Sequence, residues 1–170
     1  MKSRIVDVSL RLFARRGIDG VSIAEVALAA GVSKANVMHH FGSKNGLYAA
    51  CLDVIDGHLH AAVDRAVTDD DAVDGLAASL ASWSAEYPDD CRVMAYGLLR
   101  LLDQPGRWAL ASPVERMVVL VAGAGHDRDE ATRIVVDLLG TVTYREMAQP
   151  LISAGESRID SSRHARQEHQ

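Results

Sequence analysis

The stretch GVSKANVMHHFGSK, from Gly31 to Lys44, gathers side chains that bind metals, attack carbonyl groups or donate hydrogen bonds to nucleic acids. Two adjacent histidines stand there beside serine, lysine and asparagine. Three kinds of site follow from these residue types: a metal site, a serine–histidine catalytic pair, or a surface that lies against a polyanion. The spacing of the residues decides between them.

Consecutive histidines are poorly spaced for metal binding. If His39 and His40 lie on a helix, their side chains point about 100° apart. Two ligands from one helix need a spacing of three or four residues to meet at one ion. His58 and His60, in the segment HLH, are splayed in the same way. We therefore expect no metal site and no cofactor.

Catalysis is equally poorly supported. Residues 31–35 read GVSKA, which lacks the last glycine of the G-x-S-x-G elbow found in hydrolases. That elbow also follows a strand, whereas a helical pattern precedes Ser33. No other serine–histidine–aspartate or paired-carboxylate arrangement stands out, so we expect a protein that is not an enzyme.

The helices around this stretch are well marked. Apolar residues follow the helical period over residues 2–16, and Gly17 is expected to end that helix as a left-handed cap. In SIAE, Ser22 and Glu25 have the spacing of a capping box that opens a second helix. Gly31 breaks this second helix after the inward stripe of Ile23, Val26, Ala27 and Ala30.

A third helix and a fourth follow directly. Ser33 is a good N-cap for a helix that runs to about Phe41. Gly42 then stops this helix, and Ser43 caps the fourth. Two short helices joined by a glycine-containing turn, with a supporting helix before them, are typical of the helix-turn-helix, whose second helix enters the major groove of DNA.

The rest of the chain is also helical in pattern. Residues 68–71, TDDD, form a polar loop, Pro88 ends one helix, and QPG at 104–106 interrupts another. Ser112 is expected to cap a helix with Pro113 at its first position, and Asp127 to cap the next helix. The expected helices cover about 43 to the sixties, 72–87, 89–103, 113–124 and 128–150.

These patterns predict an all-α fold, with no convincing strand and no internal repeat. We divide it into a helix-turn-helix DNA-binding domain (1–47), a helical ligand-binding and dimerisation domain (48–154) and a polar C-terminal tail (155–170). Composition leaves open whether the tail is loose or extends the last helix.

Charge is distributed unevenly between these parts. Residues 1–47 hold seven basic and three acidic residues, a balance of +4, whereas the remainder hold eleven basic and twenty acidic residues, a balance of −9. A basic head on an acidic body suggests a polyanion partner for the head alone.

The two cysteines, Cys51 and Cys91, lie in apolar segments without a C-x-x-C spacing. They are interpreted as reduced core thiols of a cytoplasmic protein. We find no signal peptide, and no apolar run reaches the roughly 18 residues that a membrane span needs. No membrane partner is expected.

Residues Leu10–Leu52 resemble the DNA-binding domain of the TetR (tetracycline-repressor) family of bacterial regulators. The matching features are LFARRG at the end of the first helix, SIAEVALAAGVS across the second helix and the turn, HHF at the end of the third, and SK at the start of the fourth. The body is similar to the family only in outline.

A helix that enters the major groove presents its N-terminal residues to the bases. Here these are Lys34, Ala35 and Asn36: lysine can donate to guanine, asparagine can pair with adenine, and alanine allows close approach. The resemblance assigns phosphate contacts to other side chains, namely Ser22, Ser33, His39, His40 and Lys44.

The chain departs from the family pattern at two positions in this region. Met38 stands where the family often has tyrosine, which typically meets the DNA backbone. Methionine cannot donate that hydrogen bond, although it can touch a thymine methyl group. Gly46 stands where the family often has the glutamate that closes a capping box on Ser43. The chain is also short for the family, which implies a smaller ligand pocket.

The body is expected to bind a small apolar or amphipathic ligand of unknown identity. The candidate lining is the group of large side chains in the middle helices, Trp83, Tyr87, Met94, Tyr96, Leu98 and Trp108. The last two helices are more apolar than one small core needs, which indicates a homodimer. The candidate interface is Val118, Val119, Val121, Ile134, Val135, Leu138 and Val142.

The sequence therefore predicts a ligand-responsive homodimeric repressor that binds a palindromic operator in double-stranded DNA. Two alternatives remain open. One is a helical dimer of the same fold that acts through protein partners without reading DNA. The other is a metal or redox sensor assembled from Cys51, Cys91 and His58 or His60.

Overall fold

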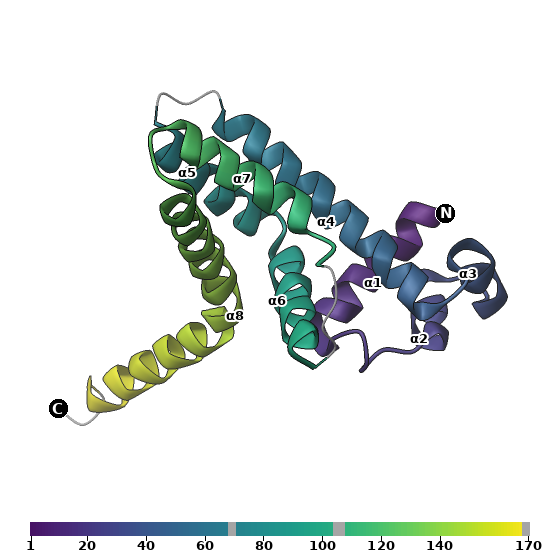
Figure 1. The fold of residues 1–170 in the computed structure, drawn as a ribbon. Coiled ribbons are helices and arrows are strands. Elements are labelled where there is room, and N and C mark those ends of the chain that lie inside the picture. Colours follow the sequence, from purple (N-terminus) through teal and green to yellow (C-terminus); the bar gives the residue numbers. More distant parts are fainter. Residues whose placement is uncertain (68–70, 104–107, 168–170) are drawn as a thin grey trace.

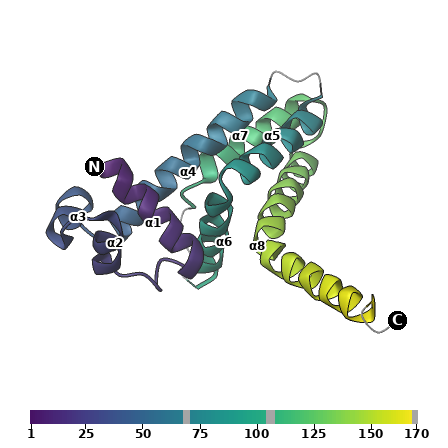
Figure 2. The same cartoon turned by 180° about the vertical axis from the view of Figure 1, so that it is seen from behind.

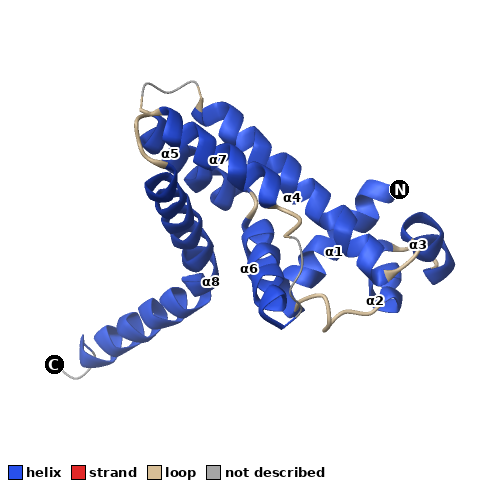
Figure 3. Ribbon diagram, viewed as in Figure 1, coloured by secondary structure: helices blue, strands red, loops and turns tan. Residues whose placement is uncertain are grey.

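The computed structural model describes the chain at residues 1–67, 71–103 and 108–167, and its side chains except at 102, 103 and 150–167. These described residues form eight α-helices and no strand, so the all-α prediction is confirmed (Figures 1 and 3). The helices are α1 (Lys2–Arg16), α2 (Ile23–Ala30), α3 (Lys34–Phe41), α4 (Lys44–Ala66), α5 (Ala72–Glu86), α6 (Pro88–Asp103), α7 (Ala111–Gly123) and α8 (Arg128–Gln167).

The first three helices gather at one end of the molecule, and α4 runs from them to the opposite end (Figure 1). There α4 packs against α5 and α7, while α6 lies beside α1 and α8 beside α5, α6 and α7. Because α4 and α6 both contact α1, they join the helix-turn-helix to the body.

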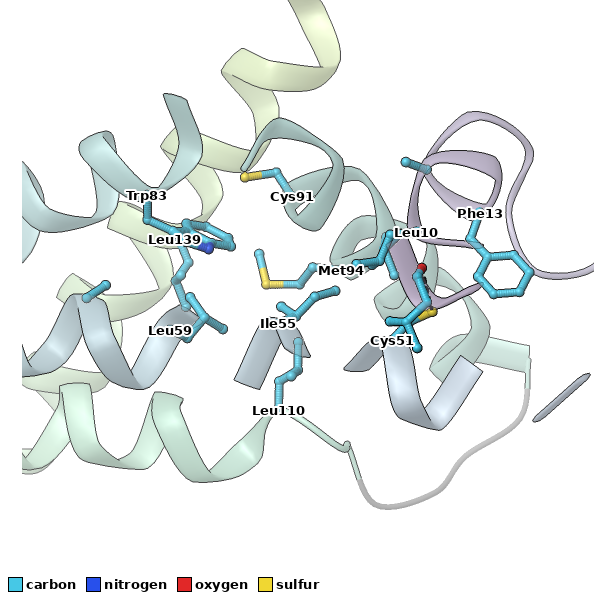
Figure 4. Close-up of a cluster of buried hydrophobic side chains, with 14 of the residues drawn as sticks. Leu10, Phe13, Cys51, Ile55, Leu59, Trp83, Cys91, Met94, Leu110 and Leu139 are labelled. Carbon is cyan, nitrogen blue, oxygen red and sulfur yellow. Dashed lines mark hydrogen bonds between the residues drawn. The ribbon is translucent and has the colours of Figure 1, made fainter. Parts of the chain in front are cut away.

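One hydrophobic core continues from the head into the body. In Figure 4, Met94 lies between Leu10 and Cys51 on the side of the head and Trp83 and Leu59 on the side of the body. All five side chains are buried. Continuous packing of this kind transmits a displacement of one helix to its neighbours.

The helix ends in the head follow the predicted capping chemistry. The Ser22 hydroxyl accepts a hydrogen bond from the Glu25 amide at 3.2 Å, and the Glu25 carboxylate accepts one from the Ser22 amide at 2.8 Å. Gly31 takes the left-handed conformation that ends α2, with φ +66° and ψ +38°. Both elements of the capping-box prediction are therefore confirmed.

Two predicted helix caps, at Gly17 and Ser112, need correction. Gly17 has positive φ (+67°), but its ψ of 169° is extended rather than left-handed. Ser112 lies inside the first turn of α7, which follows Leu110, and makes no cap; its hydroxyl lies 3.4 Å from His60 Nε2 instead. These caps were predicted from residue type alone. In the fold, the contacts of Gly17 with Tyr96 and of Ser112 with His60 accompany a different local geometry.

The last helix also extends further than predicted. It does not end at Pro150 but continues to Gln167, through most of the segment whose order the sequence left open. A proline inside a helix removes one backbone hydrogen bond and can kink the helix without ending it. In both views, α8 changes direction along its length and carries its C-terminal part away from the other helices (Figures 1 and 2).

Candidate nucleic-acid interface

The N-terminal half of α3 presents its polar side chains outward. Lys34 and Ala35 are exposed and Asn36 is half-buried, whereas Val37 is completely buried and fixes the helix to the core. The Ser33 hydroxyl caps the helix by accepting a hydrogen bond from the Asn36 amide at 3.1 Å. The three residues predicted to read bases therefore lie together at the capped end of a short, anchored helix.

The start of α1 lies beside this helix, which the sequence did not indicate. The Asn36 side-chain amide donates to Met1 Sδ at 3.2 Å, and Lys2 Nζ lies 5.7 Å from the centre of the Phe41 ring. Arg4 also reaches Gly31, in the turn between α2 and α3. A thioether is a weak acceptor, so a base edge can replace it as the partner of Asn36.

The residues assigned to phosphates surround this surface. Ser22, Ser33, His39 and His40 are exposed at the ends of α2 and α3. Lys44 differs, because it is half-buried and its Nζ donates to the Val21 carbonyl at 3.2 Å. Lys44 therefore ties the start of α4 to the loop before α2, and its contact with phosphate stays a prediction.

The structure explains one of the two departures from the family pattern, Gly46, and places the other, Met38, on the exposed face of α3. Met38 is 39% exposed on α3, next to the residues that face outward. At Gly46, a Cβ atom would collide with the Phe41 carbonyl oxygen. The glutamate that many relatives have at this position would not fit this backbone, and the Ser43 hydroxyl caps α4 alone by accepting from the Gly46 amide at 3.0 Å.

The capping box holds its carboxylate strongly ionised. Hydrogen bonds from the Ser22 amide and hydroxyl, together with the hydrogen-bonded Arg16 guanidinium at 2.9 Å, lower the pKa of Glu25 from 4.5 to about 2. Because the folded-state pKa is below the unfolded one, this group stabilises the fold above pH 4.5, and the effect disappears as the pH falls toward 2.

We expect Glu25→Ala to lower the free energy of unfolding at pH 7 and to lose this deficit progressively between about pH 4.5 and pH 2. Urea denaturation of both proteins across this range measures the difference. Ser22→Ala serves as the partner in a double-mutant cycle, and the two deficits should not add. A deficit that stays constant with pH would contradict the assignment.

The large side chains proposed to line a ligand site do not come together. Trp83 is fully buried in the core (Figure 4), and Leu98 is 43% exposed on α6. Tyr87 stacks on the His58 ring at 3.8 Å between centroids, and Tyr96 packs against Gly17. Of the six, Met94 and Trp108 share a cavity. The proposed lining therefore narrows to these two.

That cavity has a volume of about 170 Å³ and lies between α4, α6 and the segment before α7. Its lining residues are Tyr48, Leu52, Met94, Gly97, Arg100, Leu101, Trp108 and Ala109. Sequence reasoning missed Tyr48 and Arg100, because nothing in their local pattern indicates that α4 and α6 line one cavity. A larger hollow of about 390 Å³, lined in part by Asp71, Asp74 and His126, lies at the opposite end of the body.

A hydrogen-bonded pair, half-buried His58 and buried Asp90, joins α4 to the start of α6. His58 Nδ1 lies 2.7 Å from Asp90 Oδ2, and Asp90 is only 3% exposed. Burial raises the pKa of Asp90, and the hydrogen bond with His58 opposes that rise. The His58 hydrogen bond therefore favours the ionised form of Asp90. Like the cavity, the pair lies between α4 and α6.

The two cysteines are buried and reduced. Burial raises the pKa of each thiol to about 12, so neither is a thiolate at neutral pH. Among the residues that the structure describes, no group of three or more His, Cys, Asp or Glu side chains is placed to hold a metal ion.

Most of the residues proposed for the dimer interface are unavailable to a partner. Val118, Val121, Val135 and Val142 are buried within the single chain, and Ile134 and Leu138 are half-buried. The interface stays a prediction, and helical periodicity does not say which apolar stripe faces the chain's own core. Among the described side chains of α7 and α8, the exposed large apolar ones are Val119, Val136, Tyr144 and Met147.

Across the part of the chain that is described, every helix is too short or too polar to cross a membrane.

Comparison with known proteins agrees with this architecture. Residues 5–51 match the family described as bacterial regulatory proteins, tetR family. RaaS of Mycobacterium tuberculosis, an HTH-type transcriptional regulatory protein, is 36% identical over 107 residues, which cover 63% of this chain and 47% of RaaS. The match thus spans less than half of that relative.

Solved structures extend the likeness to most of the chain. The putative transcriptional regulator SCO4942 from Streptomyces coelicolor has a TM-score of 0.70 and 25% identity, covering 90% of this chain and 83% of that one. The multidrug binding protein EbrR, solved with imidazole, has a TM-score of 0.63 and 26% identity, covering 86% and 80%. The capped helix-turn-helix, the helical body and these matches together make the chain similar to transcriptional regulators of the TetR family, with the family match itself confined to residues 5–51.

Proposed function

We propose that this protein is a homodimeric transcriptional repressor that binds a palindromic operator in double-stranded DNA and responds to a small ligand. The observation that carries the proposal is the exposed start of α3, where Lys34, Ala35 and Asn36 project from a helix anchored by buried Val37. In this proposal residues 1–47 bind DNA, residues 48–154 bind ligand and form the dimer, and residues 155–170 lie beyond both. A repressor of this kind works in the cytoplasm.

The dimer is proposed to form through the outer faces of α7 and α8. Val119, Val136, Tyr144 and Met147 are all about half exposed or more there, and they lie on the body, away from the DNA-facing helix. Symmetric dimers are the commonest oligomers. A two-fold dimer of helix-turn-helix domains reads half-sites about 34–36 Å apart, one turn of DNA.

Ligand response is proposed to act on the separation or tilt of the two recognition helices. Support comes from the packing of α4 and α6 on α1, because a shift of either helix moves the head. EbrR, whose fold is similar, is described as a multidrug binding protein, and this supports a ligand in the body. The ligand has only to bind the conformation that does not fit DNA with higher affinity than it binds the conformation that does.

Salt dependence of DNA binding tests the proposal. A dimer that touches roughly 6–10 phosphates is expected to lose about a thousandfold or more in affinity for duplex DNA between roughly 50 and 200 mM salt. The Lys34→Glu variant, which places a carboxylate on the DNA-facing surface, should bind weakly throughout. Absence of binding at low salt, or equal binding by Lys34→Glu, would instead favour the dimer that acts through protein partners.

The redox alternative makes a separate prediction. Because both thiols are buried with their pKa raised to about 12, Cys51 and Cys91 should react with Ellman's reagent only after unfolding. The Cys51→Ala, Cys91→Ala double variant should keep DNA binding and any ligand response. Rapid labelling of the folded protein, or loss of DNA binding when peroxide is added, would revive the sensor alternative.

A further inference from the structure

The cavity between α4 and α6 combines apolar walls with two polar groups. Leu52, Met94, Leu101 and Trp108 supply the apolar surface, and Tyr48 and Arg100 supply the polar atoms. Its volume of about 170 Å³ is comparable with the engineered apolar cavities of about 150 Å³ that accept benzene. A single small ring therefore fits it, and a large drug-like molecule does not.

The Tyr48 hydroxyl is the unusual feature of this cavity. Its oxygen is buried, and it has no hydrogen-bond partner in the protein. A buried donor without a partner costs about 1–3 kcal/mol, so most such groups are satisfied in folded proteins. Gly97 makes room for this hydroxyl, because a Cβ atom at that position would lie only 3.1 Å from it.

Arg100 sets the sign of charge that this hydroxyl faces. Burial raises the pKa of Tyr48, and the positive charge of Arg100 opposes the rise, which places the guanidinium within electrostatic reach of the ring. Both groups line the same cavity. A phenol and a guanidinium both donate hydrogen bonds. Hydrogen bonds to a carboxylate are stronger than hydrogen bonds to a neutral acceptor.

We propose that this cavity binds a small monocarboxylate with an apolar body about the size of benzoate. The carboxylate accepts a hydrogen bond from the Tyr48 hydroxyl and pairs with Arg100. The apolar body lies among Leu52, Met94 and Trp108. The charge and size of the ligand thus follow from the lining, and the proposal narrows the small apolar or amphipathic ligand expected of the body to an anionic one.

The site is placed to act on the head, and this part of the inference rests on the proposed function. The Tyr48 ring packs edge-on against Phe13 of α1, with centroids 5.6 Å apart and planes at 78°. Outside the cavity, Tyr96 of α6 packs against Gly17, at the end of α1. A ligand that changes the spacing of α4 and α6 therefore moves both supports of α1.

Binding is tested without DNA, by calorimetric titration of the full chain with sodium benzoate at neutral pH. Benzamide has the same shape without the charge, and benzylamine has the opposite charge. We expect measurable binding of benzoate, affinity at least about tenfold lower for benzamide, and none for benzylamine, since a hydrogen bond to a charged group is worth more than one to a neutral group. No benzoate binding at millimolar concentration, or equal affinity for benzoate and benzamide, would overturn the proposal.

Two substitutions examine the polar contacts. Tyr48→Phe removes only the hydroxyl and should weaken benzoate binding about tenfold or more. The free variant should be no less stable than the wild type, because the hydroxyl has no partner to lose. Arg100→Gln should abolish the preference for benzoate over benzamide. Tyr96→Phe, a matched control on α6 outside the lining, should bind benzoate as the wild type does.

Unchanged benzoate affinity in Tyr48→Phe, or a clear loss of stability in that variant without ligand, would show that the hydroxyl is not the ligand contact. The link to regulation has its own readout, the effect of benzoate on DNA affinity. If benzoate binds as described but leaves DNA affinity unchanged, the site stands and its regulatory role fails. If DNA binding itself is absent, the proposed function fails while the calorimetric result still decides the site.

Discussion

Alanine in place of His58 is expected to lower the free energy of unfolding by about 3 kcal/mol at neutral pH, the upper end of the cost of leaving a buried polar group without its hydrogen-bond partner. The substitution leaves the Asp90 carboxylate buried without its partner at 2.7 Å. It also removes the ring that stacks on Tyr87 at 3.8 Å between centroids. Chemical denaturation of the two proteins measures the difference.

The deficit should depend on pH in a defined direction. Burial already raises the pKa of Asp90, and removing His58 takes away an interaction that opposes the rise. A carboxyl group whose pKa is raised on folding lowers the free energy of unfolding when it is ionised, and this cost disappears when the group is protonated at low pH. The deficit of His58→Ala should therefore be largest at neutral pH and shrink as the solution is acidified.

His126→Ala is the matched control for this prediction. His126 also pairs with an acidic residue, Glu130 at 3.1 Å, but that pair is substantially exposed. Exposed pairs contribute at most about 1 kcal/mol. A similar loss in both variants, or a His58→Ala deficit that does not change with pH, would contradict the role given to the buried pair.

Alanine at Lys34 or at Asn36 is expected to relax the choice of operator. Each base contact contributes about 1–3 kcal/mol of discrimination, so either variant should bind its operator roughly 5- to 150-fold less tightly for each half-site while keeping its affinity for unrelated duplexes. Lys44→Ala should instead weaken binding to all sequences alike, with part of that loss coming from its bond to the Val21 carbonyl.

Gel-shift or anisotropy titrations on one defined operator and one scrambled duplex, at the same salt concentration, separate these outcomes. If Lys34→Ala and Asn36→Ala bind the operator as the wild type does, the assignment of the base-reading residues is wrong. If they weaken binding to both duplexes equally, these residues contact phosphates.

The head was readable from sequence because its signals are local. The Ser22–Glu25 box, the Gly31 turn and the Ser33 cap each depend on residues within four positions of one another, and all three occur as predicted. Gly46 was noticed as a departure, but its cause lies in the close approach of the Phe41 carbonyl, which only the folded backbone reveals.

The body was predicted well as a set of helices and poorly as a set of surfaces. Periodicity indicates an apolar stripe but not how far each residue is buried. Val135 is buried, whereas its neighbour Val136 is 59% exposed. Tyr48 of α4 and Arg100 of α6 line the same cavity although they stand 52 positions apart in the sequence. Large aromatic residues such as Trp83 were drawn into the candidate site, although size favours the core at least as strongly.

Selection of bound sites from random double-stranded DNA, at a defined salt concentration, tests the central claim most directly. The account predicts enrichment of a palindrome whose two half-sites are centred about one helical turn apart, ~34–36 Å. The Asn36→Ala protein should enrich sites that are less constrained within each half-site. Recovery of no preferred sequence by the wild-type protein, or of a single half-site without its symmetric partner, would contradict the account of a dimer that reads an operator.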